Sequence, residues 1–406
     1  MSRYPLLACV PCLLTGAAFA VDTPAVDIHG YVSQGYLNSS KNNYLGDSQG
    51  GTFDFNEAAI NFQSQLTDDL RVGVQLYARD LDGVGGDQVG IDWAYADYHY
   101  RDELGFRVGE VKVARGLYNE YSDLDLANPT VLLPQSVYDE RLRDFLTSCY
   151  GGSVYGNIPM HEIGSIDYEA FGGSQTIRND GSVNAFLASG LYNIDGTGAT
   201  YSTNSASLQS MYGLSVTWNT PLRGLRVNGS FIQFNHLDAS GQVSVPTGFG
   251  PNASYPVSFE ITKGQNVVAG AEYLKGKLRL AGEGTLWNMD TSYSSPLFGG
   301  AVPGVTRWAG WYLQAAYQIL PKIQLAGTVS AFYENRLNRS GSNFADPRFG
   351  YQKSAALTVR FDPVTWVALK AEGAFITGYA QMFNQDNPNG YDGNTLLLSL
   401  KATVSF

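Results

Sequence analysis

The chain has 406 residues and an acidic balance, with 37 Asp and Glu side chains against 26 Lys and Arg and a formal net charge of −11. This balance argues against a nucleic-acid partner, because phosphate binding needs clustered positive charge. After the first 20 residues there is no run of 18 consecutive apolar residues, so a transmembrane helix is not expected. The mean hydropathy of −0.15 would suit a soluble protein, but it also suits strands in which apolar and polar residues alternate.

The N-terminus has the pattern of a secretory signal peptide. Residues 6–19 are apolar and follow a positive start, and a small-x-small cleavage site ends at Ala20. Two of the three cysteines lie in this segment, so only Cys149 remains and no internal disulfide can form. We therefore expect residues 1–20 to be removed and residues 21–406 to form one mature domain.

Short segments of alternating apolar and polar residues fill the rest of the chain, and tight turns alternate with long connections between them. This asymmetry is typical of a membrane barrel with short turns at one end and long loops at the other. We count sixteen strands, with fourteen or eighteen as alternatives. The predicted strands are residues 26–37, 54–66, 70–79, 91–101, 104–112, 147–157, 163–172, 209–219, 224–235, 257–274, 277–289, 307–319, 322–335, 352–361, 364–377 and 393–406.

The last predicted strand carries the clearest pattern. Leu398, Leu400 and Val404 fall on the same face as the terminal Phe406, whereas Lys401 falls on the opposite face with Ser and Thr residues. One apolar and one polar face suit a barrel wall between lipid and water. A C-terminal Phe after such a strand resembles the assembly signal of bacterial outer-membrane β-barrels. The sequence therefore predicts an all-β fold, a transmembrane antiparallel β-barrel.

Strand parity predicts which charged side chains face the lumen, because Arg or Lys facing lipid at mid-membrane costs roughly 2–4 kcal/mol. The competing interpretation is that each such cation pairs with an acidic wall residue and only stiffens the barrel. Among the expected inward cations are Arg71, Arg79, Arg107, Arg360 and Lys401.

The connection 113–146 is long and rich in apolar residues, so we expect it to pack inside the barrel. In position and length it resembles the third extracellular loop of sixteen-stranded general diffusion porins of Gram-negative bacteria, which folds into the pore and narrows it. Residues 107–119 also resemble the stretch that leads into that loop in porin-like proteins, although those often have Pro where Ala114 stands.

The resemblance implies a water-filled channel in the outer membrane for passive diffusion of small hydrophilic solutes and ions. It also implies contact with the lipid bilayer and with outer-leaflet lipopolysaccharide, a homotrimeric assembly, and no cofactor. A substrate-selective channel is the nearest alternative, for either sugars or anions such as phosphate. Inward aromatic residues could form a sugar path: Tyr77, Trp93, Tyr95, Trp287 and Tyr312.

The loop itself carries more acidic than basic side chains. We expect Glu120, Asp123 and Asp125 to face the wall cations, because opposed charges at a constriction select ions and orient polar solutes. Arg115 is expected at the same constriction, whereas residues 139–144 are expected to form a short solvated helix with internal ion pairs.

Other functions find less support in the sequence. The four histidines lie in no nucleophile motif, so an outer-membrane enzyme is not expected, and His and Cys lack metal-site spacing. Residues 80–87 offer oxygen ligands for a loose calcium site but lack the EF-hand pattern, so a Gly/Asp-rich loop is preferred. Adhesion through the outer loops remains an alternative that the sequence does not test.

Overall fold

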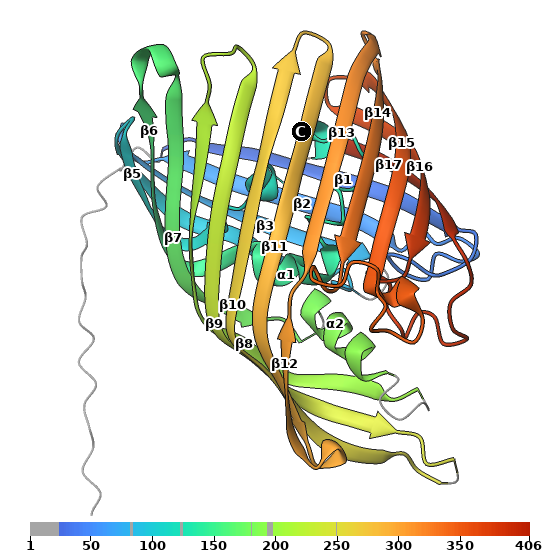
Figure 1. Ribbon diagram of the computed structural model, residues 1–406. Coiled ribbons are helices and arrows are strands. Elements are labelled where there is room, and N and C mark those ends of the chain that lie inside the picture. Colours follow the sequence, from blue (N-terminus) through green and yellow to red (C-terminus); the bar gives the residue numbers. More distant parts are fainter. Residues whose placement is uncertain (1–23, 82–83, 122–124, 180, 193–197, 249) are drawn as a thin grey trace, which may run out of the picture.

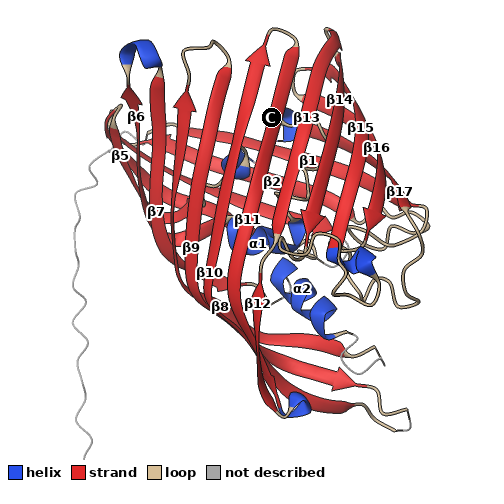
Figure 2. Ribbon diagram, viewed as in Figure 1, coloured by secondary structure: helices blue, strands red, loops and turns tan. Residues whose placement is uncertain are grey.

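A computed structural model describes residues 24–81, 84–121, 125–179, 181–192, 198–248 and 250–406. The predicted signal peptide, residues 1–20, lies outside this range. The described residues form one antiparallel sheet that closes on itself as a barrel (Figures 1 and 2). The all-β prediction is therefore confirmed.

Sixteen strands make the barrel wall, as predicted, and each pairs with its neighbours in chain order. A seventeenth strand, β12 (Gly300–Thr306), pairs only with β11, and β11 pairs directly with β13 to continue the wall. The wall strands are β1 (Val26–Ser39), β2 (Phe55–Gln65), β3 (Leu70–Leu81), β4 (Gly90–Arg101), β5 (Leu104–Lys112), β6 (Ser148–Pro159), β7 (Ser165–Ile177), β8 (Thr200–Asn219), β9 (Leu225–Val245), β10 (Ala253–Lys275), β11 (Leu278–Ser295), β13 (Ala309–Leu320), β14 (Ile323–Tyr333), β15 (Tyr351–Val364), β16 (Val367–Gly378) and β17 (Thr395–Ser405).

The first and last strands close the barrel. β1 pairs with β17 from Tyr31 opposite Ser405 to Ser39 opposite Leu397. Past this ladder, the backbones of Gly30 and Phe406 exchange two hydrogen bonds, of 3.0 and 2.9 Å. A Cβ on Gly30 would lie 2.7 Å from the Phe406 ring, so glycine is needed where the terminal aromatic ring crosses the seam.

Side chains alternate across the wall as the sequence predicts. In β17, Leu396, Leu398 and Leu400 are exposed on the outside, whereas Ser399 and Lys401 are buried on the inside. Exposed outward Leu, Val, Phe and Trp side chains continue around the other strands. Apolar surface of this extent is stable only against lipid, so the outward face is the membrane face.

Four long strands extend beyond the rest of the wall at one end of the barrel (Figure 1). Together with β12, the ends of β8 to β11 form a projecting sheet whose outer face carries polar residues such as Ser240 and Ser258. Its inner face carries Val243 and Val257, which belong to an apolar cluster with Leu191 of the helix α2 (Ser182–Leu191).

The projecting sheet corrects part of the sequence analysis. Residues 200–208, 236–245, 253–256, 290–295 and 300–306 were expected in loops, but they are strands. Outside the bilayer the outer face of a strand no longer needs apolar residues, so the membrane pattern stops where the strands continue.

The remaining helical segments are short. They are η1 (Asn119–Tyr121), η2 (Asp125–Ala127), η3 (Glu140–Leu142), α1 (Arg143–Leu146), η4 (His161–Ile163), η5 (Pro296–Phe298) and η6 (Pro347–Gly350). Within the described parts of the chain, no helix has the length and apolar character to cross a bilayer.

Candidate pore constriction

The loop between β5 and β6 contacts inward-facing side chains on several sides of the barrel wall. Its first half carries η1 and η2, and its second half carries η3 and α1. Residues 122–124, which include the predicted site residue Asp123, lie outside the described residues.

Asp125 joins the loop to the wall at β16 and β17. Its carboxylate lies 2.9 Å from Lys370 Nζ and 3.2 Å from Lys401 Nζ, and it accepts a 2.6 Å hydrogen bond from Thr403. Lys370 also donates to the carbonyl oxygens of Asp125 and Thr130. Burial alone would raise the pKa of Asp125, but the two lysines outweigh it and hold that pKa well below its ordinary value.

Lys401 connects this cluster to β2, because its Nζ lies 2.6 Å from the carboxylate of Glu57. The four ionic side chains Glu57, Asp125, Lys370 and Lys401 are each less than 10% exposed. They form a balanced, buried network that we call the Asp125 cluster. The expected pairing of Asp125 with Lys401 is present, and Lys370 is a second partner of this carboxylate.

A second group of contacts ties the loop to β10 and β11. Arg115 is 1% exposed, and its Nε donates a 2.7 Å hydrogen bond to Asn266. Glu283 accepts hydrogen bonds from the Leu117 amide at 2.7 Å and from the Tyr138 hydroxyl at 2.6 Å. Arg115 was predicted at the constriction, and in the structure its side chain is buried between the loop and the wall.

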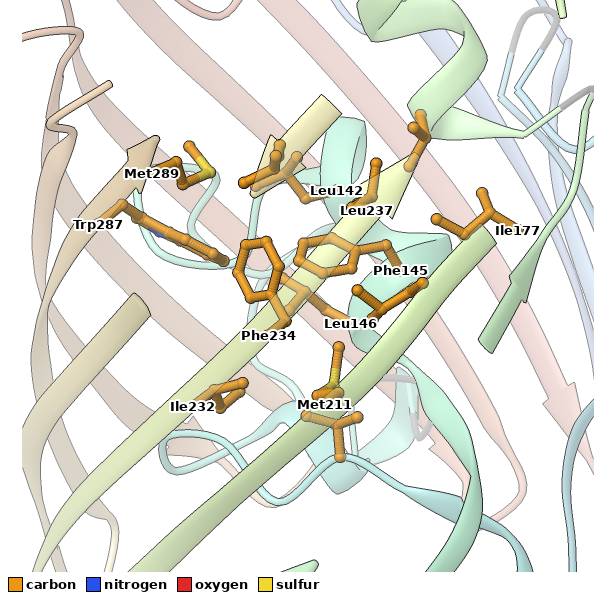
Figure 3. Close-up of a cluster of buried hydrophobic side chains, with 14 of the residues drawn as sticks. Leu142, Phe145, Leu146, Ile177, Met211, Ile232, Phe234, Leu237, Trp287 and Met289 are labelled. Carbon is orange, nitrogen blue, oxygen red and sulfur yellow. The ribbon is translucent and has the colours of Figure 1, made fainter. Parts of the chain in front are cut away.

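Apolar packing holds the end of the loop that carries α1. Phe145 lies 4.9 Å from Phe234 in an edge-to-face arrangement and 6.3 Å from Trp287, measured between ring centroids. Figure 3 shows these rings together with Leu146 and Met211 in one cluster of buried apolar side chains. This packing explains why so apolar a loop does not extend into water.

Residues 139–144 are helical in part, as expected, but they are not solvated. Asp139 and Arg141 form an internal ion pair at 2.7 Å, and both are less than 10% exposed. Glu140 forms an ion pair with Arg79 of β3, and Arg141 donates to the carbonyl oxygen of Ala380. The expectation of a water-exposed helix was therefore wrong, because this segment is packed against the wall and α2.

Arg107 of β5 lies beside the first half of the loop. Its guanidinium lies 2.9 Å from Glu169 of β7, 3.6 Å from Asp97 and 4.0 Å from Glu120. Partial burial and the nearby Glu169 raise the pKa of Glu120 to about 7, against the opposing effect of Arg107. Glu169 was missed from the sequence, although the alternation in β7 already places it on the same side as the buried Phe171.

The two other predicted cations have different partners. Arg71 pairs with Asp97 at 2.9 Å, so it lies within the wall of β3 and β4. Arg360 pairs with Asp362 at 2.8 Å and also donates to the loop carbonyl of Asn128 at 3.1 Å. The loop thus contacts Arg79, Arg107, Arg360 and Lys401. Arg71 instead contacts Asp97 of β4 and Gln63 of β2, which belong to the wall.

The inward aromatic residues are dispersed. Trp93 and Tyr95 lie 5.0 Å apart on β4, but Trp287 is 3% exposed in the apolar cluster and Tyr312 is 1% exposed against Glu283. Two of the five are therefore covered by the loop. Across the described residues, no group of three or more His, Cys, Asp or Glu side chains is placed to hold a metal ion.

Space remains between the loop and one side of the wall. A cavity of about 410 Å³ lies among β3 to β7, the α1 segment and residues 85–91. Its lining includes Arg79, Arg143 and Arg178 together with Asp92 and Asp144. Two cavities where the loop meets the rest of the wall measure about 40 and 60 Å³, which is room for a few waters.

Comparisons with known proteins find structures of similar fold, but no protein of similar sequence. No protein-family model matches the chain. No curated protein matches it either. Solved structures match along nearly the whole length.

OmpT of Vibrio cholerae is 11% identical, with 96% of this chain and 99% of that chain covered and a TM-score of 0.53. OmpF of Salmonella typhi is 13% identical, with 95% and 98% covered and a TM-score of 0.53. OprB of Pseudomonas putida is 14% identical, with 95% of both chains covered and a TM-score of 0.52. The chain therefore has the same kind of fold, a sixteen-stranded antiparallel β-barrel, as these outer-membrane proteins.

Proposed function

We propose that the protein is an outer-membrane porin, a water-filled channel through which small hydrophilic solutes and ions diffuse passively. The observation that supports this most is the loop between β5 and β6, which is tied by charged side chains to strands on different sides of a closed barrel. A loop in this position narrows the lumen and sets charges along the remaining path.

The remaining path, in this proposal, follows the cavity along β3 to β7. The volume there is several times that of the cavities on the other sides of the loop. Its mixed lining of Arg79, Arg143, Asp92 and Asp144 favours polar solutes of either charge over a strict anion or sugar path. A substrate-selective channel remains the second candidate, supported by the three arginines at this cavity.

The remaining expectations belong to the same proposal. Residues 1–20 would direct export through the periplasm, and the outward apolar face would contact lipid and lipopolysaccharide. One solved OmpT structure from Vibrio cholerae, with a TM-score of 0.51 and 11% identity, is described as a trimer form, which supports a homotrimer here. We assign no catalytic activity, cofactor or metal.

Planar-bilayer recording of the purified protein tests the proposal. We expect discrete conductance steps that grow with salt concentration, together with weak ion selectivity. Added sugar or inorganic phosphate should not block the current at millimolar concentration. A folded protein without conductance would refute the porin assignment, and a strong block by either solute would favour the selective channel.

The ion preference of the channel should depend on pH through Glu120. Because its pKa is raised to about 7, this carboxyl is neutral at pH 5 and negatively charged at pH 9. The charges that surround it are Glu169, Arg107 and Lys112. We therefore expect the preference for cations, measured as reversal potential in a salt gradient, to rise across this range.

The variant Glu120→Gln should keep the low-pH preference at all pH values. As a matched control, Asp69→Asn changes an exposed carboxyl at the turn between β2 and β3 and should leave the pH profile unchanged. An unaltered profile in Glu120→Gln would show that another group controls the selectivity.

A further inference from the structure

The charges at the short turns are divided between two parts of the barrel rim. The turns after β6, β8, β10 and β13 line the top edge of the barrel in Figure 1, opposite the projecting sheet. The turns from β2 to β3, β4 to β5 and β6 to β7 carry five exposed carboxylates: Asp68, Asp69, Asp102, Glu103 and Glu162. The turns from β8 to β9, β10 to β11 and β13 to β14, each taken with its two flanking residues, carry four exposed cations and no carboxylate. We call these four cations the basic row: Arg223, Lys275, Lys277 and Lys322.

The three turns of the basic row lie side by side along the rim. The Leu274 amide donates to the Gly224 carbonyl oxygen at 2.8 Å, so the first turn contacts the second. The Gln318 amide donates to the Lys277 carbonyl oxygen at 2.9 Å, which connects the second turn to β13. Six strands spaced about 4.8 Å apart carry these turns, so the row spans roughly 24 Å of the rim.

Within the part of the chain that the structure describes, no carboxylate forms an ion pair with the basic row. Lys322 donates through Nζ to the carbonyl oxygen of Pro363 at 2.5 Å, which leaves its charge uncompensated. In the acidic part of the rim, by contrast, the exposed Arg101 lies 3.6 Å from Glu103. Four adjacent cations without a partner are not a consequence of composition, since the chain carries a net charge of −11.

The basic row lies at the edge of the membrane face. Leu222 and Leu320, at the same turns, are 57% and 53% exposed, and Tyr317 on the outer side of β13 is 51% exposed. Leucines of this kind belong to the apolar band, and tyrosine prefers the boundary between hydrocarbon and headgroups. The cations beside them are therefore at the height of the lipid headgroups. Short turns face the periplasm in outer-membrane barrels, so these headgroups belong to the periplasmic leaflet.

We propose that the basic row binds phospholipids with a net negative headgroup in the periplasmic leaflet. Lys and Arg attract such headgroups, whereas a zwitterionic headgroup balances its own phosphate with an ammonium group. Near an anionic surface each Lys or Arg strengthens binding about fivefold. The acidic part of the rim repels the same headgroups, so these lipids would gather on one side of the barrel. The inference goes beyond the proposed channel, because lipid binding requires no conductance.

Titration of lipid into the purified protein in a neutral detergent tests this inference. Native mass spectrometry counts the bound molecules of phosphatidylglycerol or phosphatidylcholine, with the two lipids matched in their acyl chains. We expect the wild type to bind phosphatidylglycerol more tightly than phosphatidylcholine. The variant Lys275→Gln/Lys277→Gln should weaken the binding of phosphatidylglycerol about 25-fold and leave that of phosphatidylcholine unchanged.

The matched control is Arg307→Gln/Arg339→Gln, which removes two exposed cations at the end of the barrel that carries the long loops. The control changes the net charge by the same amount and should leave phosphatidylglycerol binding unchanged. An equal loss in the two variants would show a response to net charge alone and would refute the site. If Lys275→Gln/Lys277→Gln fails to fold, Arg223→Gln/Lys322→Gln should show the same loss, and unaltered binding in that variant would refute the site as well.

Two further results would overturn the proposal. A wild type that binds both lipids equally would show that the basic row does not select negative headgroups. Displacement of phosphatidylglycerol by soluble polyglutamate at equal charge concentration would assign the basic row to a carboxylate polymer instead of a lipid. Retention of the lipid under that challenge is the result that the position of the row beside Leu222 and Leu320 leads us to expect.

Discussion

Replacing Asp125 by alanine should lower the free energy of unfolding by about 3–5 kcal/mol, the cost typical of breaking a buried ion pair from one side. The change leaves Lys370 and Lys401 buried, with only Glu57 to balance their charge. Because Asp125 also accepts from Thr403, the loop loses every contact of this carboxylate with β16 and β17, and only backbone contacts such as those from Lys370 to the carbonyl oxygens of Asp125 and Thr130 remain there. We expect larger and less steady single-channel currents, because a loop free of this wall obstructs the lumen less.

Urea unfolding in lipid micelles, followed by tryptophan fluorescence, measures the stability, and bilayer recording measures the current. The matched control is Asp392→Ala, which removes a carboxylate 2.6 Å from Lys41 in an ion pair whose side chains are 49% and 75% exposed. Exposed pairs contribute little, so this variant should lie within about 0.5 kcal/mol of the wild type. Equal effects of the two variants would show that the Asp125 cluster does not hold the loop.

The wall of the barrel could be predicted from the sequence because the membrane imposes a strict alternation. A charged side chain that faces lipid is costly, so Lys401 in β17 and Arg107 in β5 had to point inward. Short turns that contain Pro, Gly or Asp marked the ends of strands in the sequence. They therefore determined the predicted number of strands. The prediction failed only where that constraint ends, at β12 and the projecting parts of β8 to β11.

The candidate constriction was less predictable, because alternation gives the side of the wall but not the partner across the lumen. Arg107 was placed correctly, yet its shortest ion pair is with Glu169 of β7 rather than with the loop. Arg115 lies in the loop, where no parity applies, and only the fold shows that it is buried against Asn266. Residues 139–144 were expected to be solvated because most of them are charged and could pair within one short helix, but Asp139 and Arg141 pair with each other, and Glu140 with Arg79, while buried.

Replacing Phe145 by alanine should also cost about 3–5 kcal/mol in unfolding free energy, as large-to-small changes in a packed core do. Phe145 is 2% exposed and packs against Phe234 of β9 and Trp287 of β11, so its removal leaves a hole that the neighbouring strands cannot close. This change weakens the attachment of the loop at α1. That attachment is apolar, whereas the attachment at the Asp125 cluster is ionic. Urea unfolding provides the measurement here as well.

The dependence on salt concentration distinguishes the apolar attachment of the loop from the ionic one. The apolar attachment does not depend on charge, so the cost of Phe145→Ala should stay the same or grow as salt is raised. Phe106→Ala, on the lipid side of β5, is the matched control, because that ring is 39% exposed and leaves no enclosed hole. A cost no greater than that of the control would mean that α1 is held by its hydrogen bonds rather than by packing. We also expect both Phe145→Ala and Asp125→Ala to increase the single-channel current. If their losses of unfolding free energy are additive in the double variant, the two attachments hold the loop independently of each other.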